Sequence, residues 1–152
     1  MDTLKTHDDL LIRDYRDSDY PEIFNLWHVT DMDNPVRGDN RETIDRTLKL
    51  GGKMLVLESI PGKQVIGASW MTYDGRRIML HHFGILPEYQ GKGLSKILLK
   101  ECFKFCKEIG AQVKLEVHSH NIKAVSLYTK FGFKHLGGYN VYIIRDISKL
   151  LS

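Results

Sequence analysis

The chain has 152 residues, of which 42% are hydrophobic and 27% are charged, and its formal net charge is +3. This length suffices for one domain with a hydrophobic core, and we expect that domain to span residues 1–152. The mild charge does not call for a nucleic-acid partner, and the apolar runs are too short to cross a bilayer. The polar first residues lack the apolar stretch of a secretion signal, so a cytoplasmic protein is expected.

Cys102 and Cys106 are the two cysteines of the chain, and their i, i+4 spacing places them on one side of a predicted helix. This spacing is neither a CxxC redox pair nor a zinc-ligand pattern, and it argues against a disulfide framework. The cysteine usage therefore also favours a reducing cytoplasm.

The first half of the chain predicts a strand, two helices and then three strands. The first strand covers residues 10–13, and the helix after it begins near Ser18 with an early proline. Asn40 is the expected cap of the second helix. Turn sequences then separate three runs of β-forming residues, at 54–58, 65–73 and 78–85. This spacing predicts an antiparallel meander.

The second half predicts a long helix from Gly93 to Gly110. Its apolar residues keep the spacing of one buried stripe: Leu94, Ile97, Leu98, Cys102, Phe105 and Ile109. A strand at 113–117 follows, and the connection across the helix suits a parallel crossover. A short helix and two further strands, at 133–136 and 141–147, complete the chain. The order β-α-α-β-β-β-α-β-α-β-β describes an α/β domain with a mixed sheet.

A glycine-rich turn joins the strand ending at Leu86 to the long helix. Backbone N–H groups at a helix N-terminus lack acceptors, and together with the helix dipole they favour an anion, above all a phosphate. No GxxxxGK[ST] motif is present, which excludes a Walker A loop. A dinucleotide fingerprint needs a third glycine beyond Gly91 and Gly93, and it follows a strand of a parallel sheet. The sheet before this loop is predicted to be antiparallel, which argues against this fingerprint as well. The chain is therefore predicted to bind some other phosphorylated ligand near its middle.

Two motifs narrow that choice. Gln90-x-x-Gly93-x-Ser95 resembles the acetyl-CoA signature Gln/Arg-x-x-Gly-x-Gly/Ala of the GNAT superfamily of N-acyltransferases, with Ser95 where glycine or alanine is usual. The stretch from Asn121 to Phe133 resembles the second motif of that superfamily, Asn-x-x-Ala-x-x-Leu-Tyr-x-x-x-Gly-Phe. The order of elements matches as well, so the resemblance covers nearly the whole chain.

The resemblance implies that an acetyl group moves from acetyl-CoA to a primary amine by direct attack, without a metal. It implies a coenzyme site at Phe83, Gly84, Ile85, Gln90, Gly91, Lys92, Gly93, Leu94, Ser95, Lys96 and Asn121. The loop N–H groups would bind the diphosphate, and a bulge at Gly84-Ile85 would aim an N–H group at the thioester carbonyl. Three alternatives stay open: Gly84 serves packing, the two lysines are incidental, and Asn121 caps a helix.

Two side chains are candidates for proton transfer. Family members often use the tyrosine that matches Tyr128 to protonate the departing CoA thiolate; the alternative is that Tyr128 only packs its helix against the sheet. Period-two alternation places Arg77, Met79, His81, Phe83 and Ile85 on one face of the strand. Family members with a base on this strand place it at Met79 or His81, so His81 is the candidate base. The alternatives are a hydrogen-bonded structural histidine or a water chain, and His82 is expected to be structural on the opposite face.

Further candidates for lining the acceptor cleft are Glu58, His118, His120, Tyr139, Trp27, Met32 and Arg37. The pair His118-x-His120 has the spacing of two metal ligands, but no third ligand is evident, so no metal site is predicted. The acceptor is left open among a small-molecule amine, a peptide N-terminus and a lysine. Many relatives pair through their last strands, which indicates residues 141–144 as the contact of a homodimer.

Two competing functions remain from the sequence. One is an acyl-CoA-binding or sensing domain of the same fold that has no activity. The other is an unrelated nucleotide-binding regulator, which would prefer ATP or NAD to CoA.

Overall fold

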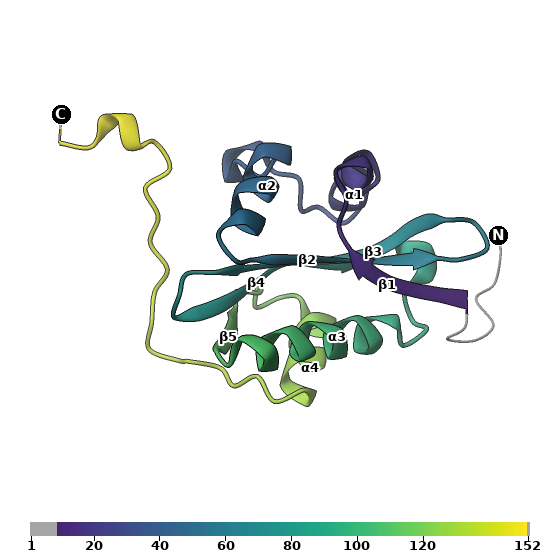
Figure 1. Cartoon of the computed structure of the whole chain (residues 1–152). Coiled ribbons are helices and arrows are strands. Elements are labelled where there is room, and N and C mark those ends of the chain that lie inside the picture. The colour runs from purple at the N-terminus through teal and green to yellow at the C-terminus, as the bar shows by residue number, and fades with distance from the viewer. Residues whose placement is uncertain (1–8, 152) are drawn as a thin grey trace.

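Residues 9–151 are described by the computed structural model, so the polar N-terminal segment considered above lies outside the described residues, from residue 1 to residue 8. Five strands form one sheet in the order β1-β2-β3-β4-β5 (Figure 1). Their bounds are β1 Leu10–Asp14, β2 Lys53–Ser59, β3 Gln64–Tyr73, β4 Arg77–Ile85 and β5 Gln112–Leu115. The first four strands pair antiparallel, and β5 is parallel to β4. The predicted meander and the parallel crossover are both confirmed.

Helices cover both faces of the sheet. In Figure 1, α1 (Tyr20–Val29) and α2 (Arg41–Lys49) lie on one face, and α3 (Leu94–Ile109) and α4 (Ile122–Lys130) lie on the other. The Asn40 side chain caps α2 by accepting a hydrogen bond from the backbone of Thr43, as predicted. No helix in the described part of the chain is both long and apolar enough to span a membrane.

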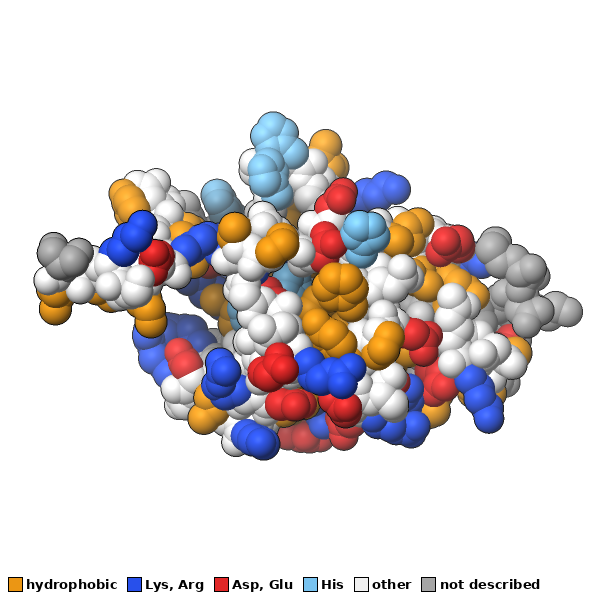
Figure 2. Space-filling model, turned by 90° about the horizontal axis from the view of Figure 1, so that it is seen from above, with side chains coloured by type: hydrophobic (Ala, Val, Ile, Leu, Met, Phe, Trp, Pro, Cys, Tyr) orange, Lys and Arg blue, Asp and Glu red, His pale blue; other side chains and the backbone are white. Residues whose placement is uncertain are grey.

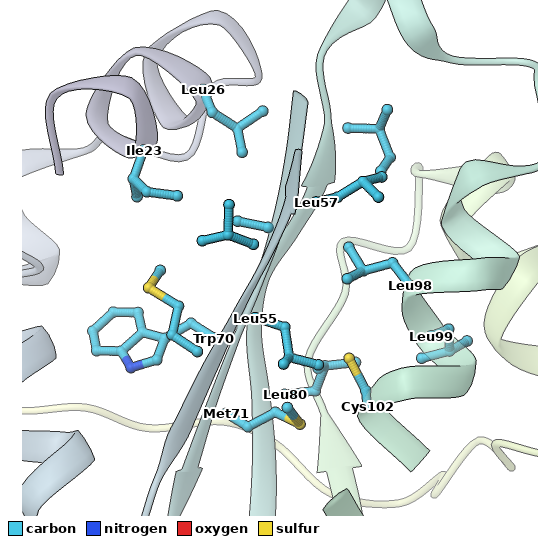
Figure 3. Packing of buried hydrophobic residues seen from close by; sticks show 14 of the residues in the cluster. Ile23, Leu26, Leu55, Leu57, Trp70, Met71, Leu80, Leu98, Leu99 and Cys102 are labelled. Atoms are coloured by element: carbon cyan, nitrogen blue, oxygen red, sulfur yellow. The ribbon is translucent and has the colours of Figure 1, made fainter. Parts of the chain in front are cut away.

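The core occupies both sides of the central strands. In Figure 3, Ile23, Leu26 and Trp70 lie on the side of α1, and Leu80, Leu98 and Cys102 lie on the side of α3. Because both faces are covered, β3 carries an unbroken run of buried residues at positions 65–71 rather than an alternating pattern. Burying each leucine stabilises the fold by roughly 1.5–3 kcal/mol.

The two predicted C-terminal strands are wrong. Residues 134–151, here called the C-terminal arm, contain one short turn, η5 (Ile147–Lys149), and pair with no strand. In Figure 1 the arm leaves α4 and runs past the end of the sheet to the side of α2. The Arg145 guanidinium donates a hydrogen bond to the carbonyl of Val36 at 2.9 Å. The β-forming residues at 141–144 supply the right side chains, but a strand also needs a neighbour for its backbone groups.

Candidate functional site

The glycine-rich turn is an open loop at the start of α3. Gly91 and Gly93 have φ angles of 77° and 78°, a region that glycine enters without steric cost. A Cβ built on either residue would meet no heavy atom within 4 Å, so the outer side of the loop is free. Gly93 is the N-cap of α3 and makes no side-chain cap, which leaves the first N–H groups of the helix without an acceptor inside the helix. The loop therefore has the donors and the space that an anion needs.

The side chains of the loop divide into those that hold it and those that face water. Gln90 donates from its amide to the carbonyl of Ile85 at 2.9 Å, which ties the loop to the end of β4. Leu94 is buried in the core, and the ammonium of Lys92 lies 5.4 Å from the ring centroid of Tyr89. Lys96 is exposed in the first turn of α3. Gln90 and Leu94 thus position the loop, while its backbone remains available.

Beside this loop, β4 continues beyond the end of β5. The ladder between them runs only from Arg77 to Leu80, although β4 continues to Ile85. Towards β5, the stretch of β4 from His81 to Ile85 therefore has no strand partner among the described residues. Unpaired backbone groups along a strand form hydrogen bonds readily with an extended ligand. This edge of β4 could pair with such a ligand, and it ends at the glycine loop.

A β-bulge interrupts β4 at His82 and Phe83. Ala68 faces Gly84 and Trp70 faces His81, so two residues of β4 oppose the single residue Ser69. His82 has a φ angle of 42°, which is rare for a residue other than glycine. The bulge expected at Gly84-Ile85 is therefore wrong in position, because those two residues pair regularly with β3.

The bulge also reverses the alternation of side chains. His81 and His82 both contact Trp70, at centroid distances of 5.8 and 5.6 Å, so they share the face covered by α1 and α2. Phe83 lies on the other face against Tyr128, with ring centroids 6.0 Å apart. The predictions that Phe83 and Ile85 share the face of His81, and that His82 lies opposite His81, are both wrong. Period-two alternation fails wherever a strand has an extra residue.

His81 is a half-buried histidine with one hydrogen bond. Its Nε2 atom lies 2.9 Å from the hydroxyl of Thr72. Burial, followed by the neighbouring His82, lowers the pKa of His81 below 6.5. The imidazole is therefore mainly neutral at neutral pH and has one nitrogen free to accept a proton. This geometry is compatible with a base and equally with a hydrogen-bonded structural histidine, so the role of His81 stays a prediction.

His82 has a partner that sequence reasoning missed. Its Nε2 donates to the carboxylate of Asp39 at 2.6 Å, and its side chain is 5% exposed. The ring also lies 4.6 Å from the centroid of Trp27. Asp39 lies in the loop before α2, 43 residues from His82, and no pattern in the sequence links the two.

Tyr128 lies on the opposite face, next to Phe83 and Phe133. Burial raises the pKa of Tyr128 to about 12, so the phenol keeps its proton at neutral pH. The hydroxyl makes no hydrogen bond to the described residues, although the ring is packed. Asn121 accepts a hydrogen bond from the backbone of Ala124 at 3.2 Å, so the capping alternative holds for this residue. Tyr128 thus combines a packed ring with an available proton.

The structure separates several of the other candidates from this site. Glu58 pairs with Arg13 at 2.9 Å, and Tyr139 is 81% exposed in the C-terminal arm. His118 and His120 lie side by side in an exposed segment. Within residues 9–151, no group of three or more His, Cys, Asp or Glu side chains is placed to hold a metal ion.

Two of the predicted acceptor-wall residues adjoin β4: Trp27 contacts His82, and Met32 contacts Gly84. Trp27 stacks on Trp70, with ring centroids 5.8 Å apart. The terminal methyl of Met32 lies against Gly84, because a Cβ built on that glycine would meet it at 2.8 Å. The packing alternative for Gly84 therefore has a partner in Met32. Arg37 is exposed in the short turn η3 (Pro35–Arg37).

Comparison with known proteins agrees with this architecture. A model of the acetyltransferase (GNAT) family matches residues 11–133, and the chain therefore belongs to this family. Its structure is similar to that of a Trypanosoma brucei acetyltransferase, with 21% identity, a TM-score of 0.72, and coverage of 90% of this chain and 100% of that chain. It is also similar to that of a Streptococcus agalactiae acetyltransferase, with 17% identity, a TM-score of 0.75, and coverage of 90% of this chain and 92% of that chain. A GNAT family acetyltransferase from Elizabethkingia anophelis, solved with acetyl-CoA bound, has 18% identity, a TM-score of 0.63, and coverage of 84% and 77%.

Proposed function

We propose that the protein is an N-acetyltransferase that moves an acetyl group from acetyl-CoA to a primary amine of a small molecule or peptide, in a ternary complex. The observation that carries this proposal is the edge of β4 that extends beyond the end of β5 without a strand partner among the described residues and leads to the open glycine loop. Acetyl-CoA is bound in a structural neighbour of this fold, the Elizabethkingia anophelis enzyme. The acetyl acceptor would reach β4 from the face that carries His81.

The residues present fit the coenzyme. The backbone N–H groups from Gly91 to Lys96 would hold its diphosphate, and Ser95 adds only a small hydroxyl to that cradle. The unpaired edge of β4 at positions 83–85 would hold the amide-containing arm. The coenzyme supplies an activated acetyl thioester. Since Asn121 is already engaged as the cap of α4, its contribution to coenzyme binding would be through its free amide NH2 group.

The protein moves two protons. With Nε2 of His81 donating to Thr72, Nδ1 keeps its lone pair and accepts the proton that the amine nitrogen loses as it forms the new C–N bond. The lowered pKa of His81 keeps this base neutral and ready at neutral pH. On the other face of β4, Tyr128 gives its phenolic proton to the sulfur as the C–S bond breaks. Neither proton has to pass through the sheet.

A panel of primary amines, with release of free thiol as the readout, tests this proposal. We expect thiol release that depends on both the amine and acetyl-CoA. Binding of acetyl-CoA without thiol release from any amine would favour the non-catalytic alternative. Thermal shifts distinguish the third possibility, because a ligand at a hundred to a thousand times its Kd stabilises a protein by about 3–4 kcal/mol. Larger shifts with ATP or NAD than with CoA would indicate a nucleotide-binding regulator.

We also propose a homodimer, formed through residues 141–144 of the C-terminal arm. The support is the exposure of the apolar arm residues, together with the free outer edge of β5, the last strand of the sheet. Light scattering of the full chain and of Ile143→Lys tests it. A mass of one chain for the unmodified protein would contradict the proposal. The buried, unpaired thiols of Cys102 and Cys106 support a reducing, cytoplasmic location.

A further inference from the structure

We propose that the acceptor is a small primary amine that also carries an anionic group, and that this anion binds to Arg76, Arg77 and Lys114 in a cavity next to His81. The inference rests on the proposed function and deepens it, because it names the chemical class of the acceptor. It arises from a cavity of about 610 Å³ that these residues line with Thr72, Met79 and His81.

The cavity follows the sheet on the side that carries His81. Thr72, Met79 and Lys114 face one another across β3, β4 and β5, and form one row of side chains. The row formed by Trp70 and His81 lies two residues further along β4, and Arg77 lies two residues in the other direction. At about 3.3 Å per residue, His81 is separated from Lys114 by roughly 7 Å along the strand and from Arg77 by roughly 13 Å. A molecule that reaches both ends must be longer than an α-amino acid.

The cations of this cavity are not neutralised by the protein. Among the described residues, no carboxylate forms an ion pair with Arg76, Arg77 or Lys114, whereas Arg13, Arg41 and Lys53 are all paired. Arg77 donates from Nε to the side chain of Gln112 at 3.1 Å, which orients its guanidinium and leaves both terminal nitrogens free. A planar guanidinium with free terminal N–H groups suits a carboxylate or phosphate.

The acidic groups nearby cancel only part of this charge. Asp74 accepts hydrogen bonds from the backbone N–H groups of Arg76 and Arg77, at 2.8 and 2.7 Å, and these bonds lower the pKa of its carboxyl. Asp74 is thus engaged by the turn between β3 and β4. Glu116 lies beyond the end of β5 and acts electrostatically on His81. Three cations and one engaged carboxylate line the cavity, so it favours an anion.

Apolar side chains lie between the two ends. Met79 lies between His81 and Arg77 along β4. Tyr73 at the end of β3 also lines the cavity, and Leu136 approaches from the C-terminal arm. Seen from the α1 and α2 side, Figure 2 shows Lys and Arg side chains (blue) at the hollow between the arm and the body. The cavity therefore combines a base, a short apolar wall and a cationic end. That arrangement suits an aliphatic amine with a terminal carboxylate or phosphate.

These cations are also placed away from the coenzyme loop. They lie at the amino end of β4, whereas the open glycine loop follows its carboxyl end at Ile85. A diphosphate bound at that loop would therefore be too far from Arg76, Arg77 and Lys114 to neutralise their charge. The acceptor itself is the remaining source of negative charge.

The test compares ω-amino carboxylates of increasing length with their carboxamides and with diamines of equal length. In the unmodified protein we expect kcat/KM for the best amino carboxylate to exceed that of its carboxamide by about tenfold to a hundredfold, the range for a charge-assisted hydrogen bond. Aminoalkyl phosphates form a second arm, which distinguishes the two kinds of anion. Equal or better turnover of the carboxamides or diamines would overturn the inference and leave the proposed function intact. Absence of thiol release from all three series would overturn the proposed function itself.

Substitutions of the three cationic residues test whether they cause the preference for amino carboxylates. Arg76→Gln and Arg77→Gln should each remove most of the preference by raising the KM for the amine, with the KM for acetyl-CoA unchanged. Lys107→Gln makes the same change of charge in the exposed last turn of α3 and should leave the preference intact. If the preference survives in Arg76→Gln, Arg77→Gln and Lys114→Gln, these residues do not bind the anion. Arg76 is exposed, so its substitution tests the inference without risk to the fold.

Discussion

The two halves of β4 have the same backbone direction and the same neighbour, β3, but the bulge between them changes which residues face each side of the sheet. Before the bulge, residues with odd numbers, such as His81, face α1 and α2. After the bulge, the odd-numbered Phe83 faces Tyr128 of α4. One extra residue therefore moves the odd-numbered positions from the face that carries His81 to the face that carries Tyr128.

In the proposed reaction, the two halves of β4 would let the amine and acetyl-CoA approach the strand without competing for one binding site. The amine and its base would occupy the α1 and α2 face, and the coenzyme would lie along the unpaired edge of β4 on the carboxyl side of the bulge. Substitutions in the two halves should therefore change different kinetic quantities. The following predictions run from the largest expected effect to the smallest.

Tyr128→Phe should lower kcat by about tenfold to a thousandfold, because it removes the proposed proton donor beside the half of β4 that follows the bulge, here called the downstream half. Burial raises the pKa of Tyr128 to about 12, so the donor is protonated throughout the usual assay range. Steady-state kinetics and calorimetric titration with acetyl-CoA measure turnover and affinity separately. Tyr142→Phe, in the exposed arm, is the matched control. Unchanged turnover in Tyr128→Phe would restrict this tyrosine to packing.

His81→Ala should lower kcat/KM by about a hundredfold at neutral pH, because it removes the proposed base from the half of β4 that precedes the bulge. In the unmodified protein, activity should fall as the pH drops through the lowered pKa of His81, below 6.5. A profile of kcat/KM against pH measures this acidic limb. An acidic limb that survives in His81→Ala would show that another group takes the proton. His135→Ala, in the arm, should keep the profile of the unmodified protein.

The same pKa has a consequence for stability. Because burial holds the pKa of folded His81 below 6.5, the unfolded chain binds more protons as the pH falls through 6.5. The free energy of unfolding should therefore decrease there, and His81→Gln should reduce that decrease. Urea unfolding on both sides of this pH measures it. An identical pH dependence in the variant would contradict the assignment.

Asp39→Ala should destabilise the protein by about 1–3 kcal/mol, because it leaves the buried N–H group of His82 without an acceptor. Denaturant unfolding gives the change in free energy. Asp17→Ala removes an exposed carboxylate that lies 3.4 Å from Arg41, and its cost should stay near zero. An equal loss of unfolding free energy in the two variants would mean that the hydrogen bond between Asp39 and His82 stabilises the fold no more than an exposed ion pair does.

Gly84→Ala should have the smallest effect, about 1 kcal/mol. The added methyl would meet the terminal methyl of Met32 at 2.8 Å, and that flexible side chain can move aside. Gly62→Ala has open space and is the control. A cost well above about 3 kcal/mol would mean that the downstream half packs more tightly on the α1 side than described.

The sequence predicted the elements of this fold better than the local geometry of its site. Local signals were sufficient for the meander, for α3 with its glycine ends, and for the cap at Asn40. The bulge could not be located, because it depends on how β3 pairs with β4 and not on the composition of β4. Asp39 was missed for a similar reason, since its partner His82 lies 43 residues away.

The last two strands were wrong for a different reason. The β-branched and aromatic residues at 141–144 show which side chains a strand would carry, but they do not show whether a free strand edge is within reach. In the folded chain this edge is offered by β5, which is only four residues long. Strand prediction at a chain end thus depends on a partner that the local pattern does not describe.

The C-terminal arm also determines how the protein should respond to proteolysis. Its backbone groups are solvated instead of being held in a sheet, and its aromatic residues, Tyr139 and Tyr142, are 81% and 87% exposed. A protease that cuts after aromatic residues should therefore shorten the chain there well before it opens the sheet. Slow cleavage at these two tyrosines in concentrated protein, and fast cleavage after dilution, would report when a second copy covers them.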